Sequence, residues 1–342
     1  MDYKFILISF FLTPPILLLS FKIAKLVNFY DYPDKIRKKH KEPTLIVGGF
    51  FFLILFFFLF SLYFFVFKDF FINEEVENVI ILLITFSIIF LVGYFDDKKN
   101  LNPLFKLLTI YFIYIISLYF LSENFSLYRL EFFSKFTVEL YKFSIPFTSL
   151  CFLILLNASN MADGINSLLS IIYTIWIFFI TILLPFESLY FSINIILIFG
   201  LILFSYLNFK NKCFLGDSGC YILASYLSFI IVHVYNSELN IKSYFLNIES
   251  IFLLFLLPGL DMIRLFIKRI YKNKNPLKGD TNHLHHILNF NYGIKKTLII
   301  YSLLIIFPWT LYSIFSSMLI YLIFSVLIVY LYLINQKKNE KN

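Results

Sequence analysis

Charged residues are scarce in this chain, and their scarcity limits the class of protein. Only 15% of the 342 residues are Asp, Glu, Lys or Arg, whereas hydrophobic residues make up 60%. A soluble domain normally carries about 25% charged residues. The composition therefore excludes an ordinary soluble globular protein.

Cysteine and glycine are also uncommon, and the motifs built from them are absent. The sequence has 3 cysteines, none at metal-ligand spacing from another, so we expect reduced thiols rather than a zinc knuckle or a disulfide scaffold. It contains neither a Walker A sequence nor Gly-x-Gly-x-x-Gly. A nucleotide substrate would therefore not be held by a P-loop or a Rossmann fold.

Long apolar runs are abundant instead. A helix needs roughly 20 apolar residues to cross a bilayer. The first run has no preceding basic stretch and no small-x-small cleavage site, which favours a retained span over a signal peptide. We predict an all-α polytopic membrane protein whose single domain occupies residues 1–342. About 11 spans are expected, at residues 4–21, 48–66, 78–94, 104–121, 145–160, 166–184, 190–208, 219–236, 248–267, 297–313 and 317–334.

The distribution of basic residues predicts the orientation. If the N-terminus is outside and the C-terminus cytoplasmic, most of the 29 Lys and Arg residues fall in inner segments, as the positive-inside rule expects. The basic pI, near 9.1, is therefore explained by the membrane orientation. We expect no nucleic-acid partner. An outer segment, 130–143, alternates in hydrophobicity and suits a short β-hairpin. The inner segments expected to form the active site are 22–47, 95–103, 157–167, 209–218 and 268–296.

Four carboxylates lie at the inner ends of predicted spans, namely Asp96, Asp97, Asp163 and Asp217. A charge at the bilayer centre costs about 2.5–3.5 kcal/mol, so such residues usually face a cavity or a partner. Each Asp could simply solvate a helix end. Gathered together they would repel one another, and a divalent cation would relieve that repulsion. Mg²⁺ suits oxygen ligands and substrate phosphates, with Mn²⁺ as the alternative.

Basic residues at the same inner ends of the spans could bind the phosphate groups of a substrate that Mg²⁺ also contacts. Lys106 begins the fourth span and either meets an anion or snorkels to the interface. His40 and Lys41 either bind phosphate or headgroup or serve only the positive-inside rule. Enzymes of phosphoryl transfer use such an arrangement. Basic side chains and Mg²⁺ hold a diphosphate while an oxyanion attacks the phosphorus in line with the leaving group.

The histidines of His283-Leu-His-His286 form the last group. His283 and His286 share a helix face if residues 280–282 cap a short helix, with Leu284, Ile287 and Leu288 then facing the membrane and His285 pointing elsewhere. Zinc binding stays open, but no His-Glu-x-x-His and no Cys or Glu ligand accompanies them. Anion binding is the favoured interpretation.

Five segments in this order resemble the polyprenyl-phosphate N-acetylhexosamine-1-phosphate transferases, glycosyltransferase family 4. The resemblance runs from about residue 37 to 288. Asp96-Asp97 is similar to the family's paired aspartates and Lys106 to its phosphate-binding lysine. Asn160 and Asp163 resemble its nucleotide and metal loop, and Asp217 its principal magnesium ligand. The resemblance implies catalytic Asp96, Asp97, Asp163 and Asp217, a metal held by Asp217, Asp97 and Asn160, and substrate contacts from Lys106, Asn160, His283, His285, His286, His40 and Lys41.

Two features refine the resemblance. The His-x-His-His run is similar to the branch that starts enterobacterial common antigen and O-antigen, rather than to the peptidoglycan translocase. Where bacterial members usually have Asp-Gly-Ile-Asp-Gly, this chain has Asp163-Gly-Ile-Asn166-Ser167. The second carboxylate is missing, which puts a base or metal role at position 166 in doubt.

The expected reaction is transfer of an N-acetylhexosamine 1-phosphate, first of all N-acetylglucosamine 1-phosphate, from a UDP-sugar to undecaprenyl or another polyprenyl phosphate, releasing UMP. It would start a lipid-linked cell-envelope glycan at the cytoplasmic side of a bacterial inner membrane. A homodimer is left open. The alternative is a polytopic secondary transporter, although transporter sites usually lie near the membrane midplane.

Overall fold

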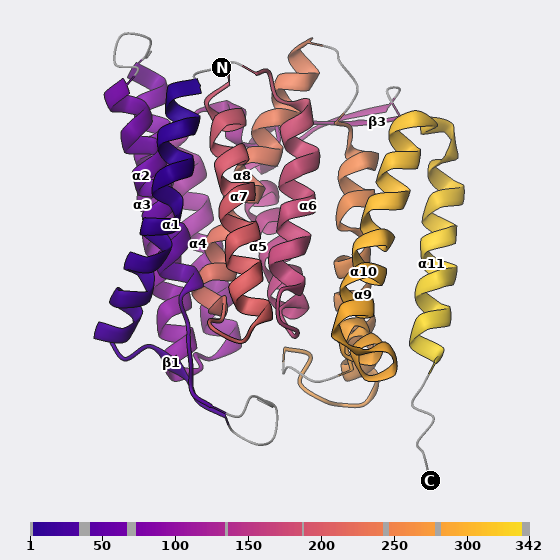
Figure 1. Cartoon of the computed structure of the whole chain (residues 1–342). Helices are drawn as coiled ribbons and strands as arrows, with labels where there is room; N and C mark the ends of the chain where they lie inside the picture. The colour runs from indigo at the N-terminus through magenta and orange to yellow at the C-terminus, as the bar shows by residue number, and fades with distance from the viewer. Residues whose placement is uncertain are drawn as a thin grey trace.

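The computed structural model describes residues 3–33, 42–66, 73–133, 136–186, 188–241, 246–277 and 282–336. These residues form a bundle of roughly parallel helices with two small hairpins at opposite ends (Figure 1). The helices are α1 (Tyr3–Leu26), α2 (Gly48–Val66), α3 (Asn73–Lys99), α4 (Pro103–Phe120), α5 (Ser144–Ala162), α6 (Leu168–Leu183), α7 (Leu189–Phe209), α8 (Gly216–Ile241), α9 (Ile248–Tyr271), α10 (Leu284–Ile314) and α11 (Leu319–Asn335).

The helices have the length and apolarity of membrane spans. Within the described ranges, nine of them are long and apolar enough to cross a bilayer, and α2 and α6 are shorter apolar helices. Large hydrophobic side chains such as Phe11 and Phe120 are exposed on the outside of the bundle, as lipid-facing residues would be. The prediction of an all-α polytopic membrane protein is confirmed, and the order of its spans matches the apolar runs of the sequence.

Helix α8 lies at the centre. Of the most apolar 18 residues within Gly216–Ser237, 94% are buried, far more than in any other long helix described. Helices α2, α3 and α5 pack around it. Because Asp217 lies in the first turn of α8, the central helix carries a carboxylate at its beginning.

Both hairpins are antiparallel and short. Strands β1 (Tyr30–Asp31) and β2 (Thr44–Leu45) pair at the lower end of Figure 1, and β3 (Arg129–Phe132) and β4 (Phe136–Glu139) pair at the upper end. The second pair confirms the hairpin expected at 130–143. The first is joined to the chain before α8, because the N–H of Val47 donates to the carbonyl of Phe214 and the N–H of Phe214 to that of Leu45.

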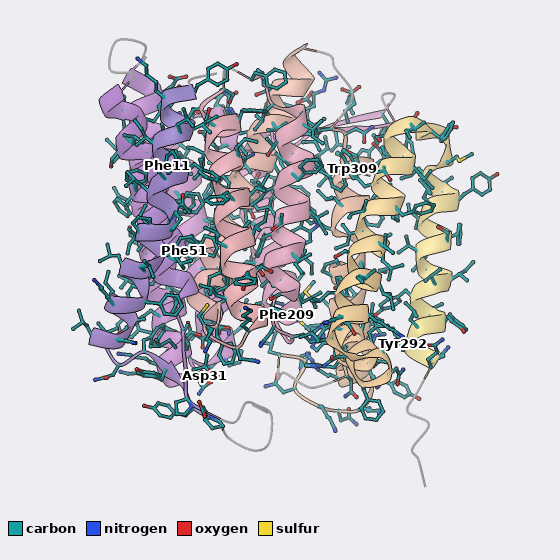
Figure 2. The ribbon with its side chains drawn as sticks, viewed as in Figure 1. Phe11, Asp31, Phe51, Phe209, Tyr292 and Trp309 are labelled. Carbon is teal, nitrogen blue, oxygen red and sulfur yellow. The ribbon has the colours of Figure 1, made fainter. Side chains whose placement is uncertain are left out.

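The chain enters and leaves the bundle at opposite ends. Helix α1 begins at the upper end of Figure 1, and α11 finishes at the lower end. The connections α3–α4, α5–α6, α7–α8 and α9–α10 therefore all lie at the lower end, where Figure 2 labels Asp31 and Phe209. We call this lower end the site end, since every candidate site residue of the described chain lies there.

Candidate functional site

Lys106 turns its ammonium toward two carboxylates. Helix α4 begins with Pro103 at its first position, and the side chain of Asn102 caps it by accepting the N–H of Leu104. Lys106 follows within the first turn. Its Nζ lies 2.6 Å from Oδ2 of Asp96 and 3.8 Å from Oδ2 of Asp217. The Lys106 side chain is thus directed at Asp96 and Asp217. It does not extend toward the membrane interface, as the snorkelling alternative expected.

Asp96 is almost fully enclosed, with 5% of its surface exposed. Besides Lys106, the hydroxyl of Tyr221 donates to Oδ2 at 2.9 Å and the N–H of Leu101 to Oδ1 at 2.9 Å. Both oxygens are therefore occupied by donors from three elements. This arrangement favours Asp96 as the residue that holds Lys106 in place over a role as a proton acceptor.

Asp97 caps the central helix. Its Oδ1 accepts the N–H of Asp217 at 2.8 Å, and its Oδ2 accepts the N–H and the hydroxyl of Ser218. The first N–H groups of a helix have no partner within that helix, and a carboxylate there also interacts favourably with the helix dipole. The carboxylate from α3 thereby fixes where α8 begins and where Asp217 is placed.

The contact between α3 and α8 needs a glycine. A Cβ at Gly93 would lie 2.4 Å from Cα of Ser218, closer than any side chain tolerates. The two backbones can therefore approach closely only because position 93 has no side chain. This close approach brings the Asp96-Asp97 pair to the start of α8.

Asp163 lies at the end of α5, where it is the C-cap residue. Its N–H donates to the carbonyl of Asn160, which lies in the last turn of the same helix. Both side chains are therefore carried by one end of α5. Solvent reaches the Asp163 side chain. Nevertheless, the surrounding protein removes part of its hydration and the charge of Asp97 lies nearby, and together they raise the pKa of Asp163 to about 7.

The four predicted catalytic carboxylates thus gather at one end of the bundle, but they do not form a closed metal cage. Asp96, Asp97 and Asp217 are linked directly through Lys106 and the cap of α8, whereas Asp163 interacts with Asp97 only through its charge. Among the described residues, no three of these carboxylates bring ligand atoms within 4.8 Å of one another. Asp217 keeps 31% of its side chain exposed, against 4% for Asp96.

The histidine motif starts a helix, but not as expected. Helix α10 begins at Leu284, and His283 is its N-cap residue with extended backbone. The expectation that residues 280–282 cap this helix is therefore wrong, although the ring of His283 still lies 6.3 Å from that of His286. The prediction that Leu284 and Leu288 face the membrane is also wrong, because both are fully buried. A non-helical break at Gly293 (φ 75°, ψ 166°) separates this first part of α10 from the span that follows.

The imidazoles reach the loop that carries Asp163. The rings of His283 and His285 are nearly parallel, with centroids 5.3 Å apart, and those of His285 and His286 are 4.3 Å apart. A Cβ at Gly164 would lie 2.1 Å from Nε2 of His285 and 2.9 Å from Nε2 of His286. The glycine after Asp163 thus lets the loop and the histidines touch. Nε2 of His285 is buried without a hydrogen-bond partner in the described chain.

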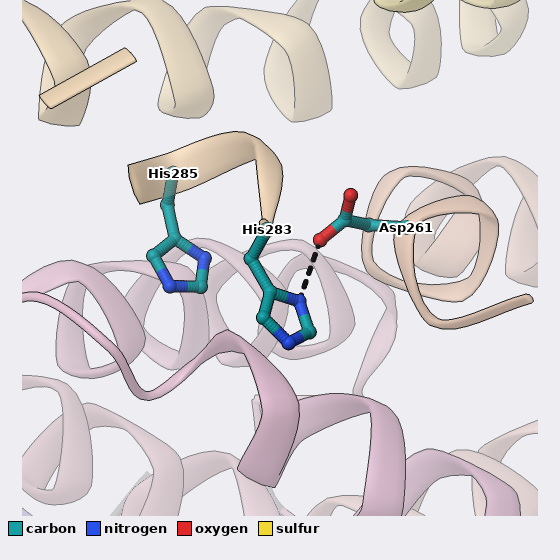
Figure 3. Close-up of side chains that lie close together, drawn as sticks. All are labelled: Asp261, His283 and His285. Atoms are coloured by element: carbon teal, nitrogen blue, oxygen red, sulfur yellow. Dashed lines mark hydrogen bonds and ion pairs between the residues drawn. The ribbon is translucent and has the colours of Figure 1, made fainter. Parts of the chain in front are cut away.

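One group does bring three ligand atoms together: Asp261, His283 and His285 (Figure 3). Oδ2 of Asp261 lies 2.8 Å from Nδ1 of His283, and Oδ1 lies 2.8 Å from a guanidinium nitrogen of Arg264. The carboxylate is therefore already occupied by donors, and the neighbouring guanidinium would repel a cation. These contacts argue against the zinc interpretation of the His-x-His-His run.

Sequence reasoning missed several residues of this end of the bundle. Tyr221 and Ser218 contact the paired aspartates, and Arg264 and Tyr330 contact Asp261. The signal available was weak: Asp261 follows Pro258-Gly-Leu inside a predicted span, and its partner Tyr330 lies 69 residues along the chain. His40 and Lys41 lie outside the described residues, so the structure says nothing about their predicted role.

Asn166, which stands where a second carboxylate was expected, has a structural partner. Its side-chain amide donates to the amide oxygen of Asn211, and the N–H of Ser167 donates to that of Asn208. Ser167 itself has a left-handed backbone with φ 66°. These bonds connect the α5–α6 loop to the end of α7 rather than to the carboxylates.

A known protein family matches the part of the chain that runs from α3 to α8. Residues 79–235 match the model of Glycosyl transferase family 4. This segment contains all four predicted catalytic aspartates, together with Lys106 and Asn160, and stops before the histidine motif.

Full-length relatives extend the similarity beyond that segment. A Thermotoga maritima protein is 29% identical over 86% of this chain and 83% of its own length. Proteins from Escherichia coli O157:H7 and Yersinia pestis are 23% and 22% identical, over 82% and 78% of this chain and 75% and 71% of their own lengths. Each of the three is named an undecaprenyl-phosphate alpha-N-acetylglucosaminyl 1-phosphate transferase.

Proposed function

We propose that this chain transfers N-acetylglucosamine 1-phosphate from its UDP derivative to undecaprenyl phosphate and releases UMP. The observation that carries the proposal is the convergence of Asp96, Asp97, Asp217 and Lys106 at the start of the central helix. The names of the relatives favour N-acetylglucosamine as the sugar and undecaprenyl phosphate as the acceptor. The His-x-His-His run favours the branch that starts enterobacterial common antigen or O-antigen.

A magnesium ion fits the oxygen donors at the site end. Lys106 contacts two of the four carboxylates, Asp96 and Asp217, so negative charge exceeds positive charge within this group, and 31% of the Asp217 side chain is exposed. Asp217 and Asp97, with Asn160, are the residues that would hold the ion. Mg²⁺ commonly uses one or two carboxylates and completes its shell with water and substrate phosphates, so the absence of a closed cage is compatible with it. When bound, it would neutralise charge on the donor diphosphate.

The protein's own residues would bind and orient the two anionic groups. An oxygen of the acceptor phosphate attacks the β-phosphorus of the UDP-sugar, the bond from that phosphorus to the bridging oxygen breaks, and UMP leaves. Lys106, held by Asp96, would neutralise a phosphate oxygen. A phosphate monoester has its second pKa near 6, so the acceptor is already mostly ionised at neutral pH. No protein base is then required.

The position of the carboxylates at the ends of the spans also bears on where in the cell the reaction would take place. A soluble nucleotide sugar and the headgroup of a membrane lipid can meet where carboxylates lie at the ends of spans. The excess of basic residues in the connections at the site end favours a cytoplasmic site in a bacterial inner membrane. The product would start a lipid-linked cell-envelope glycan.

Acceptor-dependent UMP release tests the proposal. Purified protein in detergent is expected to release UMP from UDP-N-acetylglucosamine when undecaprenyl phosphate and Mg²⁺ are both present. Release should stop when the lipid is left out or the metal is chelated, because both substrates and the ion are required at one site. Uptake of the nucleotide sugar into vesicles without UMP release would contradict the proposal and favour a transporter.

A further inference from the structure

A buried polar network connects the histidine motif to the last helix of the chain, outside the segment that matches the family model. Tyr330 of α11 donates its hydroxyl to Oδ1 of Asp261 at 2.9 Å, and Nε of Arg264 donates to the same hydroxyl at 2.8 Å. A second nitrogen of Arg264 donates to Asp261 at 2.8 Å and to the carbonyl of Asn282 at 2.7 Å. Side chains of α9 and α11 thereby fix one carboxylate.

That carboxylate determines how α10 begins. The N–H of Leu284, the first residue of the helix, donates to both oxygens of Asp261 at 3.2 Å. The N-cap residue, His283, makes no capping bond with its own side chain. Asp261 therefore replaces the missing cap from another helix and leaves the His283 ring available for other contacts.

The same carboxylate orients the His283 ring. Nδ1 of His283 lies 2.8 Å from Oδ2 of Asp261, and in Figure 3 the ring edge that carries Nε2 points away from the carboxylate. Asp261, His283 and Tyr330 are only 4%, 5% and 3% exposed, so water cannot easily replace these bonds. The ring in turn stacks on His285, whose Nε2 abuts Gly164 beside Asp163.

We propose that Asp261, Arg264 and Tyr330 are positioning residues that hold His283 so that its Nε2 faces a phosphate oxygen of the nucleotide sugar. This inference rests on the proposed function and goes beyond it by assigning the last helix a part in substrate binding. Tyr330 lies 69 residues from Asp261, and it contributes through the other two residues without touching the substrate.

A double-mutant cycle separates positioning from a purely structural role. With the wild type active, Asp261→Asn is expected to lower kcat/KM for UDP-N-acetylglucosamine about 100-fold, since small displacements of binding groups have effects of this size. In the His283→Ala background the same change should lower kcat/KM less than about twofold, because no ring remains to be oriented. An equal loss in both backgrounds would overturn the inference.

Tyr330→Phe provides a milder variant in case Asp261→Asn leaves Arg264 unpaired and the protein fails to fold. It removes the hydroxyl that bonds to both Asp261 and Arg264 and should lower kcat/KM about fivefold, mostly through KM, because His283 keeps its own bond to Asp261 and loses only the support behind it. The matched control is Tyr332→Phe on the same helix, whose side chain is 64% exposed and which should have wild-type kinetics. Equal kinetics for the Tyr330 variant and the control would also overturn the inference. Wild-type protein without acceptor-dependent UMP release would instead contradict the proposed function.

Discussion

Asp217→Asn is expected to lower turnover about 1,000-fold while leaving the fold intact, a loss typical of removing one group that stabilises transition-state charge. Asp217 has 31% of its side chain exposed, against 4% for Asp96, so it can reach a metal ion or the water shell of one. Removing its charge would weaken the binding of a cation and leave the diphosphate insufficiently neutralised. Initial rates of UMP release at saturating substrates measure the effect.

The fold should survive because of how Asp217 is bonded. Asp97 accepts the backbone N–H of Asp217 and not its side chain, so the cap of α8 is unchanged in the asparagine variant. The melting temperature in detergent should stay within a few degrees of the wild type. A suitable control is Glu123→Gln, an exposed acid beyond the other end of α4, which should leave turnover unchanged. Near-normal turnover of Asp217→Asn would contradict the metal assignment.

Lys106→Met is expected to lower both turnover and stability, for two separable reasons. The ammonium lies 2.6 Å from the enclosed carboxylate of Asp96, and leaving one partner of a buried ion pair alone costs about 3 kcal/mol or more. Turnover should fall by at least about 100-fold, because the donor phosphates lose their cation. Thermal unfolding and UMP release measure the two losses.

A second substitution separates these losses. In the double variant Asp96→Asn and Lys106→Met, the enclosed carboxylate at position 96 is gone, the more exposed Asp217 keeps its own, and the amide can still accept the hydroxyl of Tyr221. Stability should therefore return most of the way to the wild type while turnover stays low. Recovery of turnover together with stability would show that Lys106 serves only to neutralise Asp96 and has no contact with substrate.

The membrane fold could be predicted from the sequence because hydropathy is a local signal. Apolar runs gave the order of all the helices and most of their ends, and alternation gave the β3–β4 hairpin. The start of α10 could not be found this way. Residues 284–292 form a helix before the break at Gly293, and the burial of Leu284 and Leu288 within it depends on tertiary packing rather than on composition.

The location of the candidate site could be predicted from the sequence, but the contacts within it could not. Carboxylates and a lysine at span ends indicated which end of the bundle is functional, because charge there is costly unless it has a partner. The pairings were not predictable. Asp97 bonds to a helix start 120 residues later, and Asp261 is 69 residues from Tyr330. Contacts of this kind depend on tertiary packing, which no periodicity in the sequence records.

The fate of the β-phosphate tests the central claim most directly. The purified protein would be given UDP-N-acetylglucosamine with radioactive phosphorus at the β-position, together with undecaprenyl phosphate and Mg²⁺. Transfer of the sugar phosphate predicts that the label enters the lipid fraction, matched by an equal amount of unlabelled UMP. Label released into water as UDP, with sugar alone on the lipid, would contradict it.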